Sequence, residues 1–173
     1  MDVVVRVAAK AASAASAASA ASAARAADAE ADADALAIAQ LRALWMGGRP
    51  DGPFAGEMRE WLEGDGERRT VWLATAGDLA LGMGSMFEYR RMPKPAQPAS
   101  RWGYVSNMYV REEHRGRGIG SALLDAIIAA ARERGYARLV LSPSREAVAF
   151  YARAGFTVPD ASAGDNRLLV RRV

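Results

Sequence analysis

The sequence predicts a single mixed α/β domain in which helices cover both faces of a central sheet. Its 173 residues suit one domain with its own core and are too few for two. Segments with helical and strand periodicity alternate along the chain, which is typical of layered α/β folds. In addition, a glycine-rich loop at 115–120 connects a strand directly to an apolar helix. We therefore treat 1–173 as one domain.

The first half of the chain is expected to contain a strand, two helices and a hairpin. Short apolar runs rich in β-branched residues indicate the strands, and apolar residues at helical spacing indicate the helices. Glycine or proline punctuates the junctions between them. The expected elements are a strand over 3–7, helices over 34–45 and 54–62, and strands over 70–75 and 79–89.

A run of alanine, serine and acidic residues interrupts this order at 11–33. Ala-Ala-Ser occurs four times from Ala11 to Ser22, and serine at every third position keeps no constant face on a helix. The start of the chain lacks the cationic and strongly apolar segments of a secretory signal. We therefore interpret 11–33 as a low-complexity insertion. We expect the packed helix to begin at Asp34, with an apolar stripe formed by Leu36, Leu41, Leu44 and Trp45.

The second half has clearer periodicity. An apolar helix of strong amphipathic character follows the glycine loop, and glycine ends both of the helices predicted here. The expected elements are a strand over 104–110, a helix over 119–134, a strand over 137–141, a helix over 145–154 and a final strand over 167–173.

Composition excludes several classes of function. The chain has no cysteine and a single histidine, so we expect neither disulfides and thiol catalysis nor a bound metal. No stretch has the ~20 strongly apolar residues of a membrane span. The net charge of +3 is mild, and no dense basic run alternates with aromatic residues, so no nucleic-acid partner is expected. We expect a cytoplasmic protein that does not associate with membranes.

The segment Arg115-Gly116-Arg117-Gly118-Ile119-Gly120 has the chemistry of a phosphate site. Glycines allow close approach of the backbone, and the free N–H groups of the following helix, which starts near Ser121, attract anions. A nucleotide-hydrolysing loop would need lysine before Ser121, and a dinucleotide site would need a different glycine spacing. The third candidate ligand is the pyrophosphate of coenzyme A.

Two segments resemble the GNAT family of N-acetyltransferases. The segment 110–120, followed by a Leu-Leu helix, is similar to the acetyl-CoA loop of that family. The segment 144–156 is similar to its later helix, in which Phe150-Tyr151 precedes three residues and Gly155-Phe156. The order and separation of the two motifs also match, and the resemblance covers about 104–156. It implies a mixed, mostly antiparallel sheet, helices on both faces, and two strands splayed into a cofactor slot.

The resemblance also implies acetyl-CoA as co-substrate and gives roles to individual residues. A bulge in the strand over 104–110 would splay it from the strand over 137–141 and open the slot. Tyr151 would protonate the departing thiolate. Ser144 stands where the family often has asparagine, and Glu112 where proline is common. The residues implied to bind acetyl-CoA are Met108, Tyr109 and Val110 along the pantetheine arm, Arg115, Gly116, Arg117, Gly118, Ile119, Gly120 and Ser121 around the pyrophosphate, and Ser144.

The group that removes the proton from the amine is less defined. The strand over 104–110 contains no carboxylate, so the first candidate is Glu88, with Glu57 and Glu60 as alternatives. Ser106 or Asn107 would relay the proton if either holds a water molecule. His114 belongs to the pyrophosphate loop. The four tryptophans either line an acceptor pocket or pack in the core.

The leading functional hypothesis is therefore an acetyl-CoA-dependent N-acetyltransferase for a primary amine of a small molecule or peptide. A non-catalytic coenzyme A sensor of the same fold is the alternative, and a nucleic-acid binder using Arg111, Arg115 and Arg117 is a third. The acceptor pocket is expected between the first two helices, the proline-rich loop over 92–98 and the segment 159–166. Pairing of edge strands would allow a homodimer.

Overall fold

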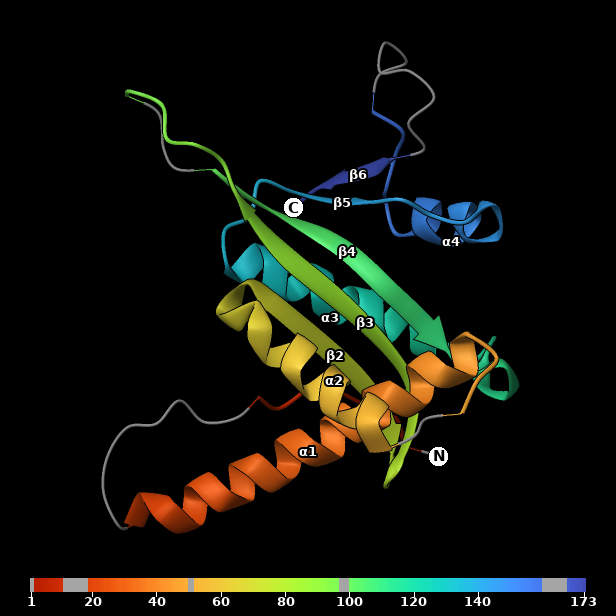
Figure 1. The fold of residues 1–173 in the computed structure, drawn as a ribbon. Coiled ribbons are helices and arrows are strands. Elements are labelled where there is room, and N and C mark those ends of the chain that lie inside the picture. Colours follow the sequence, from red (N-terminus) through yellow and green to blue (C-terminus); the bar gives the residue numbers. More distant parts are fainter. Residues whose placement is uncertain (1, 11–18, 50–51, 97–99, 160–167) are drawn as a thin grey trace.

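The computed structural model describes residues 2–10, 19–49, 52–96, 100–159 and 168–173. Three short 3-10 turns, at Gly66–Arg68, Glu112–His114 and Arg145–Ala147, connect the main elements. Among the described helices, none has an apolar stretch long enough to cross a bilayer. The main elements are β1 (Val4–Val7), α1 (Ser19–Trp45), α2 (Gly52–Gly64), β2 (Arg69–Ala76), β3 (Leu79–Arg90), β4 (Arg101–Val110), α3 (Ile119–Glu133), β5 (Arg138–Leu141), α4 (Val148–Arg153) and β6 (Leu169–Arg172) (Figure 1).

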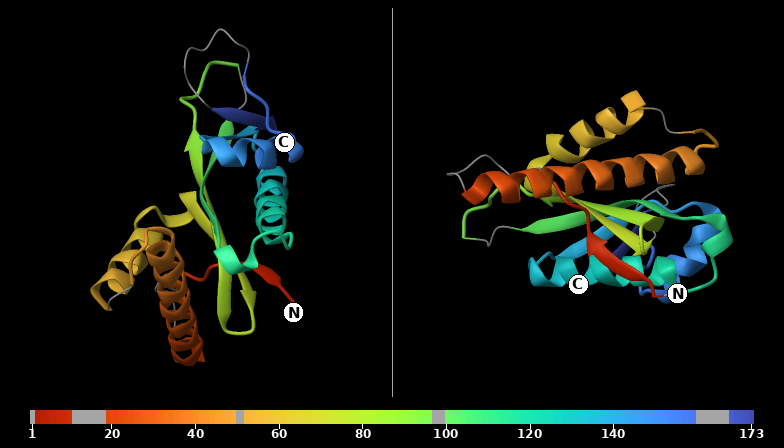
Figure 2. Two further views of the ribbon diagram at one scale, coloured as in Figure 1. Left: turned by 90° about the vertical axis from the view of Figure 1, so that its right-hand side faces the viewer. Right: turned by 90° about the horizontal axis from the view of Figure 1, so that it is seen from below.

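The six strands form one sheet in chain order, from β1 to β6. Every neighbouring pair is antiparallel except β4 and β5, which are parallel. Helices α1 and α2 cover one face of the sheet, and α3 covers the other (Figure 2). The predicted fold class, a mixed and mostly antiparallel sheet between helices, is therefore confirmed.

Each face of the sheet has its own core because side chains along a strand alternate between faces. In β2, Val71 and Leu73 pack under α1 and α2, whereas Trp72 and Ala74 pack under α3. Helix α3 faces the sheet with residues at spacings of three and four, as an amphipathic helix does. Its buried residues are Ile119, Leu123, Leu124, Ile127, Ile128 and Ala131.

Helix α1 is longer than predicted and buries a different face. It begins at Ser19 rather than near Asp34, and residues 11–18 of the expected insertion lie outside the described residues. The predicted stripe is wrong at three of its four positions, since Leu36, Leu44 and Trp45 are more than 40% exposed. Small side chains instead allow the helix to lie close to the sheet. The buried apolar residues are Ala31, Ala35, Ile38, Ala39, Leu41 and Ala43.

The remaining elements lie within a few residues of their predicted bounds. The largest difference is in the helix expected over 145–154, which is divided into a 3-10 turn and the short helix α4. After it, Thr157 forms an isolated antiparallel bridge with Val170.

A buried carboxylate fastens the start of the chain to α1. Asp34 is only 2% exposed and accepts two hydrogen bonds of 2.6 Å from the Arg6 guanidinium. It also accepts a 2.7 Å bond from the N–H of Ala9. Bidentate, charge-assisted bonds of this kind are the strong ones, so this single side chain connects β1, the segment after it and α1.

We predict that Asp34→Asn lowers the free energy of unfolding by about 2–4 kcal/mol, because it weakens the pair with Arg6 and leaves a buried donor without an acceptor. Urea denaturation measures this. Asp32→Asn is the matched control: Asp32 pairs with Arg59 but its side chain is 72% exposed, so its loss costs less than about 1 kcal/mol. Equal losses in the two variants would contradict the anchoring role of Asp34.

Candidate active site

The loop between β4 and α3 is shaped by two glycines with left-handed backbone. Gly116 has φ 73° and Gly118 has φ 80°, values that side chains with a Cβ rarely adopt. A Cβ at either position would meet no atom within 4 Å, so the backbone there is open to an approaching group. The glycines are therefore required by conformation, and the space beside them is free for a ligand.

Helix α3 directs its first N–H groups into this loop. Its first hydrogen bond runs from the Ala122 N–H to the Gly118 carbonyl oxygen at 3.0 Å, so the N–H groups of Ile119, Gly120 and Ser121 precede the helical ladder. Buried Ile119 fixes the start of the helix in the core. Such a helix start, with positive dipole end and free N–H groups, fits a phosphate or diphosphate.

Two arginines surround the same loop. Arg115 Nε donates to the Val110 carbonyl oxygen at 3.1 Å, and its guanidinium lies 3.4 Å from the Glu112 carboxylate. Arg117 is exposed. On the inner side, a Cβ at Gly120 would lie 3.6 Å from the Phe150 ring, which places α4 against the first turn of α3. The two motifs that are separate in the sequence are therefore neighbours in the structure.

Strand β4 is irregular at its centre. Ser85 pairs with Ser106 and Met83 with Tyr109, so Asn107 and Met108 together oppose Gly84. Two residues against one define a β-bulge, and Asn107 takes the left-handed backbone with φ 53°. The bulge predicted in this strand is confirmed.

Beyond the start of β4, its other edge separates from β5. The parallel pairing consists of Gly103 with Leu139 and Tyr104 with Val140, and Figure 1 shows the two strands diverging toward the end of β4. The predicted splay is thereby confirmed. From Val105 onward, the β4 edge facing this gap has no strand partner in the described part of the chain. Its main chain is therefore open to a ligand, except that the Val110 carbonyl oxygen already accepts a hydrogen bond from Arg115 Nε.

Side chains next to the bulge are already engaged on the two faces of the sheet. Met108 packs toward α3, and its sulfur occupies the place where a Cβ on Gly84 would project. Tyr109 is 8% exposed and stacks on Trp45 with ring centroids 5.6 Å apart. Val110 is half-buried. What these residues present to the gap is therefore their main chain.

Tyr151 lies on α4, buried to 7% exposure. Its ring contacts Phe150 and Phe156 edge-on, with centroid separations of 5.0 and 5.8 Å. Burial raises the pKa of Tyr151 to about 12, and its hydroxyl makes no hydrogen bond with the described residues. At neutral pH this phenol is therefore protonated and has a proton to donate. Ser144 is exposed at the start of the preceding 3-10 turn. The pKa of the neighbouring Glu146 carboxyl is lowered first by a backbone hydrogen bond and then by one from the Ser144 side chain.

Glu88 is held in a different environment from the one expected. It is 6% exposed and accepts hydrogen bonds from Arg90 Nε at 2.6 Å and the Tyr136 hydroxyl at 2.7 Å. Arg101 is 3.7 Å away. Burial acts to raise the pKa of Glu88, but these donors and charges outweigh it and the pKa is lowered. Glu88 lines a cavity of about 490 Å³ with Lys10 and a group of arginines, separate from the cavity at the bulge.

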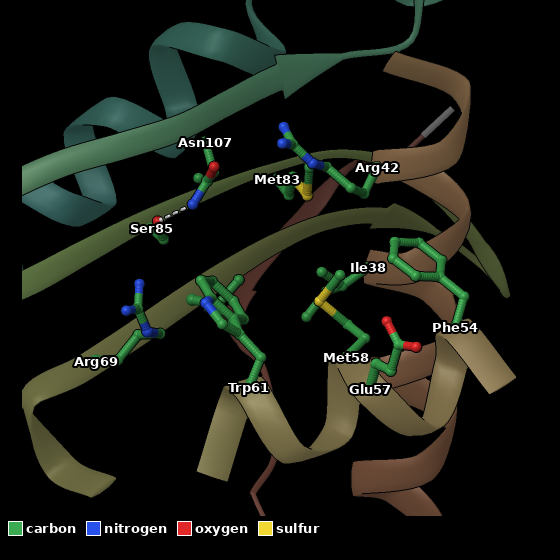
Figure 3. Close-up of a pocket in the computed structure, with 12 residues that line it drawn as sticks. Ile38, Arg42, Phe54, Glu57, Met58, Trp61, Arg69, Met83, Ser85 and Asn107 are labelled. Carbon is green, nitrogen blue, oxygen red and sulfur yellow. Dashed lines mark hydrogen bonds between the residues drawn. The ribbon is translucent and has the colours of Figure 1, made fainter. Parts of the chain in front are cut away.

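The cavity that reaches the bulge lies between the sheet and helices α1 and α2. Its volume is about 560 Å³. At its sheet side, Asn107 Nδ2 donates to Ser85 Oγ at 3.0 Å, and Ser85 Oγ in turn lies 3.0 Å from Ser106 Oγ (Figure 3). The residues that line it are Ile38, Arg42, Phe54, Glu57, Met58, Trp61, Arg69, Val71, Met83, Gly84, Ser85 and Asn107.

Of the carboxylates proposed from the sequence, this cavity includes Glu57 and not Glu60 or Glu88. It is built from the first two helices as expected, but the described part of the proline-rich loop does not line it, and residues 160–166 lie outside the described residues. Of the tryptophans, Trp61 alone lines it. Trp72 is buried in the core, Trp45 stacks on Tyr109, and Trp102 stacks on Tyr89.

Sequence reasoning missed Arg42, Met83 and Ser85 as cavity residues. Their places depend on the phase of α1 and on the register between β3 and β4, and neither leaves a local pattern in the sequence. His114 lies in the loop between β4 and α3, where its Nδ1 is buried without a hydrogen-bond partner in the described residues.

Comparisons with known proteins agree with this geometry. The model of the acetyltransferase (GNAT) family matches residues 36–156. A GCN5-related N-acetyltransferase from Ralstonia eutropha is 29% identical, with a TM-score of 0.53 over 75% of this chain and 88% of that one. A comparison with curated protein sequences gives no significant match.

Two structures of lower sequence identity share the fold. A predicted acetyltransferase from Clostridium acetobutylicum, solved with acetyl-CoA, is 22% identical with a TM-score of 0.58, covering 73% of this chain and 84% of that one. An acetyltransferase from Trypanosoma brucei is 16% identical with a TM-score of 0.61, covering 92% and 95%. Since the family match spans more than half of the sequence and includes the glycine loop, the bulge and Tyr151, the chain belongs to the GNAT family of acetyltransferases.

Proposed function

We propose that this protein transfers an acetyl group from acetyl-CoA to a primary amine of a small molecule or peptide. The observation that carries the proposal is the bulge of β4, which joins two open spaces. On one side Asn107 lines the cavity under α1 and α2. On the other, the main chain past Tyr104 leaves β5 and leads to the glycine loop. An acceptor and a cofactor arm placed in these two spaces would meet at the bulge.

The glycine loop and the start of α3 suit the pyrophosphate of acetyl-CoA, and the free edge of β4 suits its amide-containing pantetheine arm. Main-chain N–H groups from Gly116 to Ser121 bind the phosphate oxygens, with Arg115 and Arg117 adding positive charge. Met108, Tyr109 and Val110 bind the arm through their main chain, and exposed Ser144 lies near the other wall of the gap. Bound there, acetyl-CoA supplies a thioester carbonyl for the amine to attack and a thiolate as leaving group.

Of the carboxylates proposed from the sequence, Glu57 is the one that lines the cavity at the bulge, and it accepts the proton of the amine through water held by Asn107. Glu57 forms no ion pair with any described residue. The buried Glu88 fits this role poorly, because its hydrogen bonds and neighbouring arginines stabilise the charged form and lower its pKa. A carboxylate stabilised in that way is a weak base.

Two other groups of the chain stabilise charge during transfer. A main-chain N–H beside the bulge, near Met108, donates a hydrogen bond to the oxygen of the thioester carbonyl as negative charge develops on it. Tyr151 donates its proton to the leaving sulfur. Its high pKa keeps it protonated until that moment, and its position on α4 beside the first turn of α3 sets it on the cofactor side of the sheet.

The first prediction from this proposed function concerns the cofactor loop. Gly118→Glu is expected to weaken acetyl-CoA binding about 100-fold or more, since a carboxylate would face the phosphate charges. Calorimetric titration measures it. Gly135→Glu is the matched control, because Gly135 also has positive φ and open space around it but follows the opposite end of α3. Unchanged affinity in Gly118→Glu would refute this phosphate site.

The second prediction concerns the proton donor. Tyr151→Phe keeps the aromatic packing and is expected to lower kcat, measured by thiol release, about 100-fold. The affinity for acetyl-CoA, measured by calorimetry, should stay unchanged. Because burial raises the pKa of Tyr151 to about 12, its proton is present at lower pH and lost only above that value. The wild-type rate should therefore show no alkaline decline from this group below about pH 11. Full activity in the variant would leave Tyr151 a packing residue only, as in a non-catalytic coenzyme A sensor.

The third prediction concerns the base. Glu57→Gln is expected to reduce kcat about 100-fold at neutral pH, with partial recovery at higher pH as more of the amine becomes neutral in solution. Glu60→Gln, on the same helix but outside the cavity, should have no effect. A pH–rate profile that is the same for both variants and the wild type would remove Glu57 from the mechanism.

A further inference from the structure

The cavity under α1 and α2 is lined by three charged side chains, and only one of them forms an ion pair with a described residue. Arg69 is already paired: its Nε donates to Asp65 at 2.7 Å, and its guanidinium lies 4.1 Å from the centre of the Trp61 ring. Glu57 and Arg42 are the other two. Neither has an ion pair within the described part of the chain, and the two do not pair with each other.

Arg42 is the unusual one, because it is half-buried and its surroundings are mostly apolar. Among the described residues, its guanidinium is paired only with an aromatic ring, that of Trp45, whose centre lies 4.9 Å from the guanidinium carbon. Figure 3 shows the guanidinium extending into the cavity between Met83 and Asn107. A cation among apolar side chains is stabilised by a carboxylate or similar anion, and no described residue supplies one.

We propose that Arg42 binds a carboxylate of the acceptor, and that the acceptor is an α-amino acid with an apolar side chain. This inference rests on the proposed function, since it places the acceptor amine at the bulge. Arg42 and Asn107 line the same cavity, and Figure 3 shows the guanidinium directed toward the Asn107 side of it, so the anion that Arg42 binds lies in the same cavity as the reacting nitrogen at the bulge. In an α-amino acid, a single carbon separates the amine from the carboxylate.

The remaining lining agrees with the apolar side chain. Most of the cavity wall is hydrocarbon, aromatic ring or thioether, and its volume of about 560 Å³ lies in the range of small-ligand sites. A doubly charged phosphate ester fits less well, because Arg42 is the only cation of this cavity without a carboxylate partner in the described residues. The apolar residues are Ile38, Phe54, Met58, Trp61, Val71 and Met83.

The test compares acids with neutral analogues of the same shape. The pairs are L-leucine with 3-methylbutylamine and L-phenylalanine with 2-phenylethylamine. Calorimetry measures their binding to the full-length protein saturated with coenzyme A, where no transfer occurs. The wild type should bind each acid at least about tenfold more tightly than its partner, since a bidentate guanidinium–carboxylate pair is among the strong hydrogen-bonded contacts.

Variants assign that preference to one residue. Arg42→Gln should abolish the preference, because the acids should bind about tenfold or more weakly while the neutral amines bind as before. Arg42→Lys should restore part of the preference. Arg25→Gln, an exposed site on the same helix, should change nothing. A thermal melt confirms that each variant is folded.

Two readouts keep this inference separate from the proposed function. If acids and neutral amines bind equally, or if Arg42→Gln keeps the preference, the inference is overturned whether or not transfer occurs. Thiol release from acetyl-CoA with the same four compounds tests the proposed function on its own. Release with the neutral amines and no acid preference would retain the acetyltransferase and reject the role of Arg42.

Discussion

The interruption of hydrogen bonding in β4 is the constraint on which both halves of the candidate site depend. The first residues of β4 pair on both edges of the strand, with β3 and with β5. At Asn107 an extra residue enters the β3 pairing, and a bulge increases local twist and bends the strand. The same stretch has left β5. One strand therefore provides a polar pocket floor on one face and an unpaired edge beside it.

Gly84 makes that irregularity possible. It stands opposite the bulge, and Met108 sulfur and Ile127 occupy the space where its side chain would be. A Cβ there would overlap the Met108 sulfur and lie 3.1 Å from Ile127 Cδ1, so the Met108 side chain would have to move. The bulge is thus packed on the α3 face of the sheet. On the α1 face, the same bulge places Asn107 next to Ser85 in the lining of the cavity.

The sheet also separates the two proton-transfer groups of the proposed mechanism. Tyr151 belongs to the core shared with α3, where burial keeps its phenol neutral. Glu57 lines the cavity on the opposite face. Since the gap beside β4 opens between the faces, the donor and acceptor of protons reach the reacting atoms from two sides without pairing with each other. Glu88, by contrast, accepts a hydrogen bond from Arg90 and lies 3.7 Å from Arg101, so its charge is already paired within the protein.

The sequence alone determined the features that depend on neighbours in the chain. Positive φ at Gly116 and Gly118 is a property of the residue type, and the strands and amphipathic helices follow from periodicity over short windows. The motif around Tyr151 is likewise local. These signals sufficed for the mixed α/β fold class and the glycine loop, whereas the bulge was expected only from the resemblance to the GNAT family.

Only the tertiary structure decided which faces and charges meet. The face of α1 that is buried is set by alanines, which let the helix lie close to the sheet. The prediction, which used leucines to mark the buried face, was therefore wrong for Leu36 and Leu44. Glu88 accepts a hydrogen bond from Tyr136 and pairs with Arg101, and both residues lie far from it in the chain. The cavity around Arg42 and Glu57 is formed only when two helices and three strands pack together in the correct register. Such long-range contacts are set by the free energy of packing the whole domain, which no local pattern of residues records.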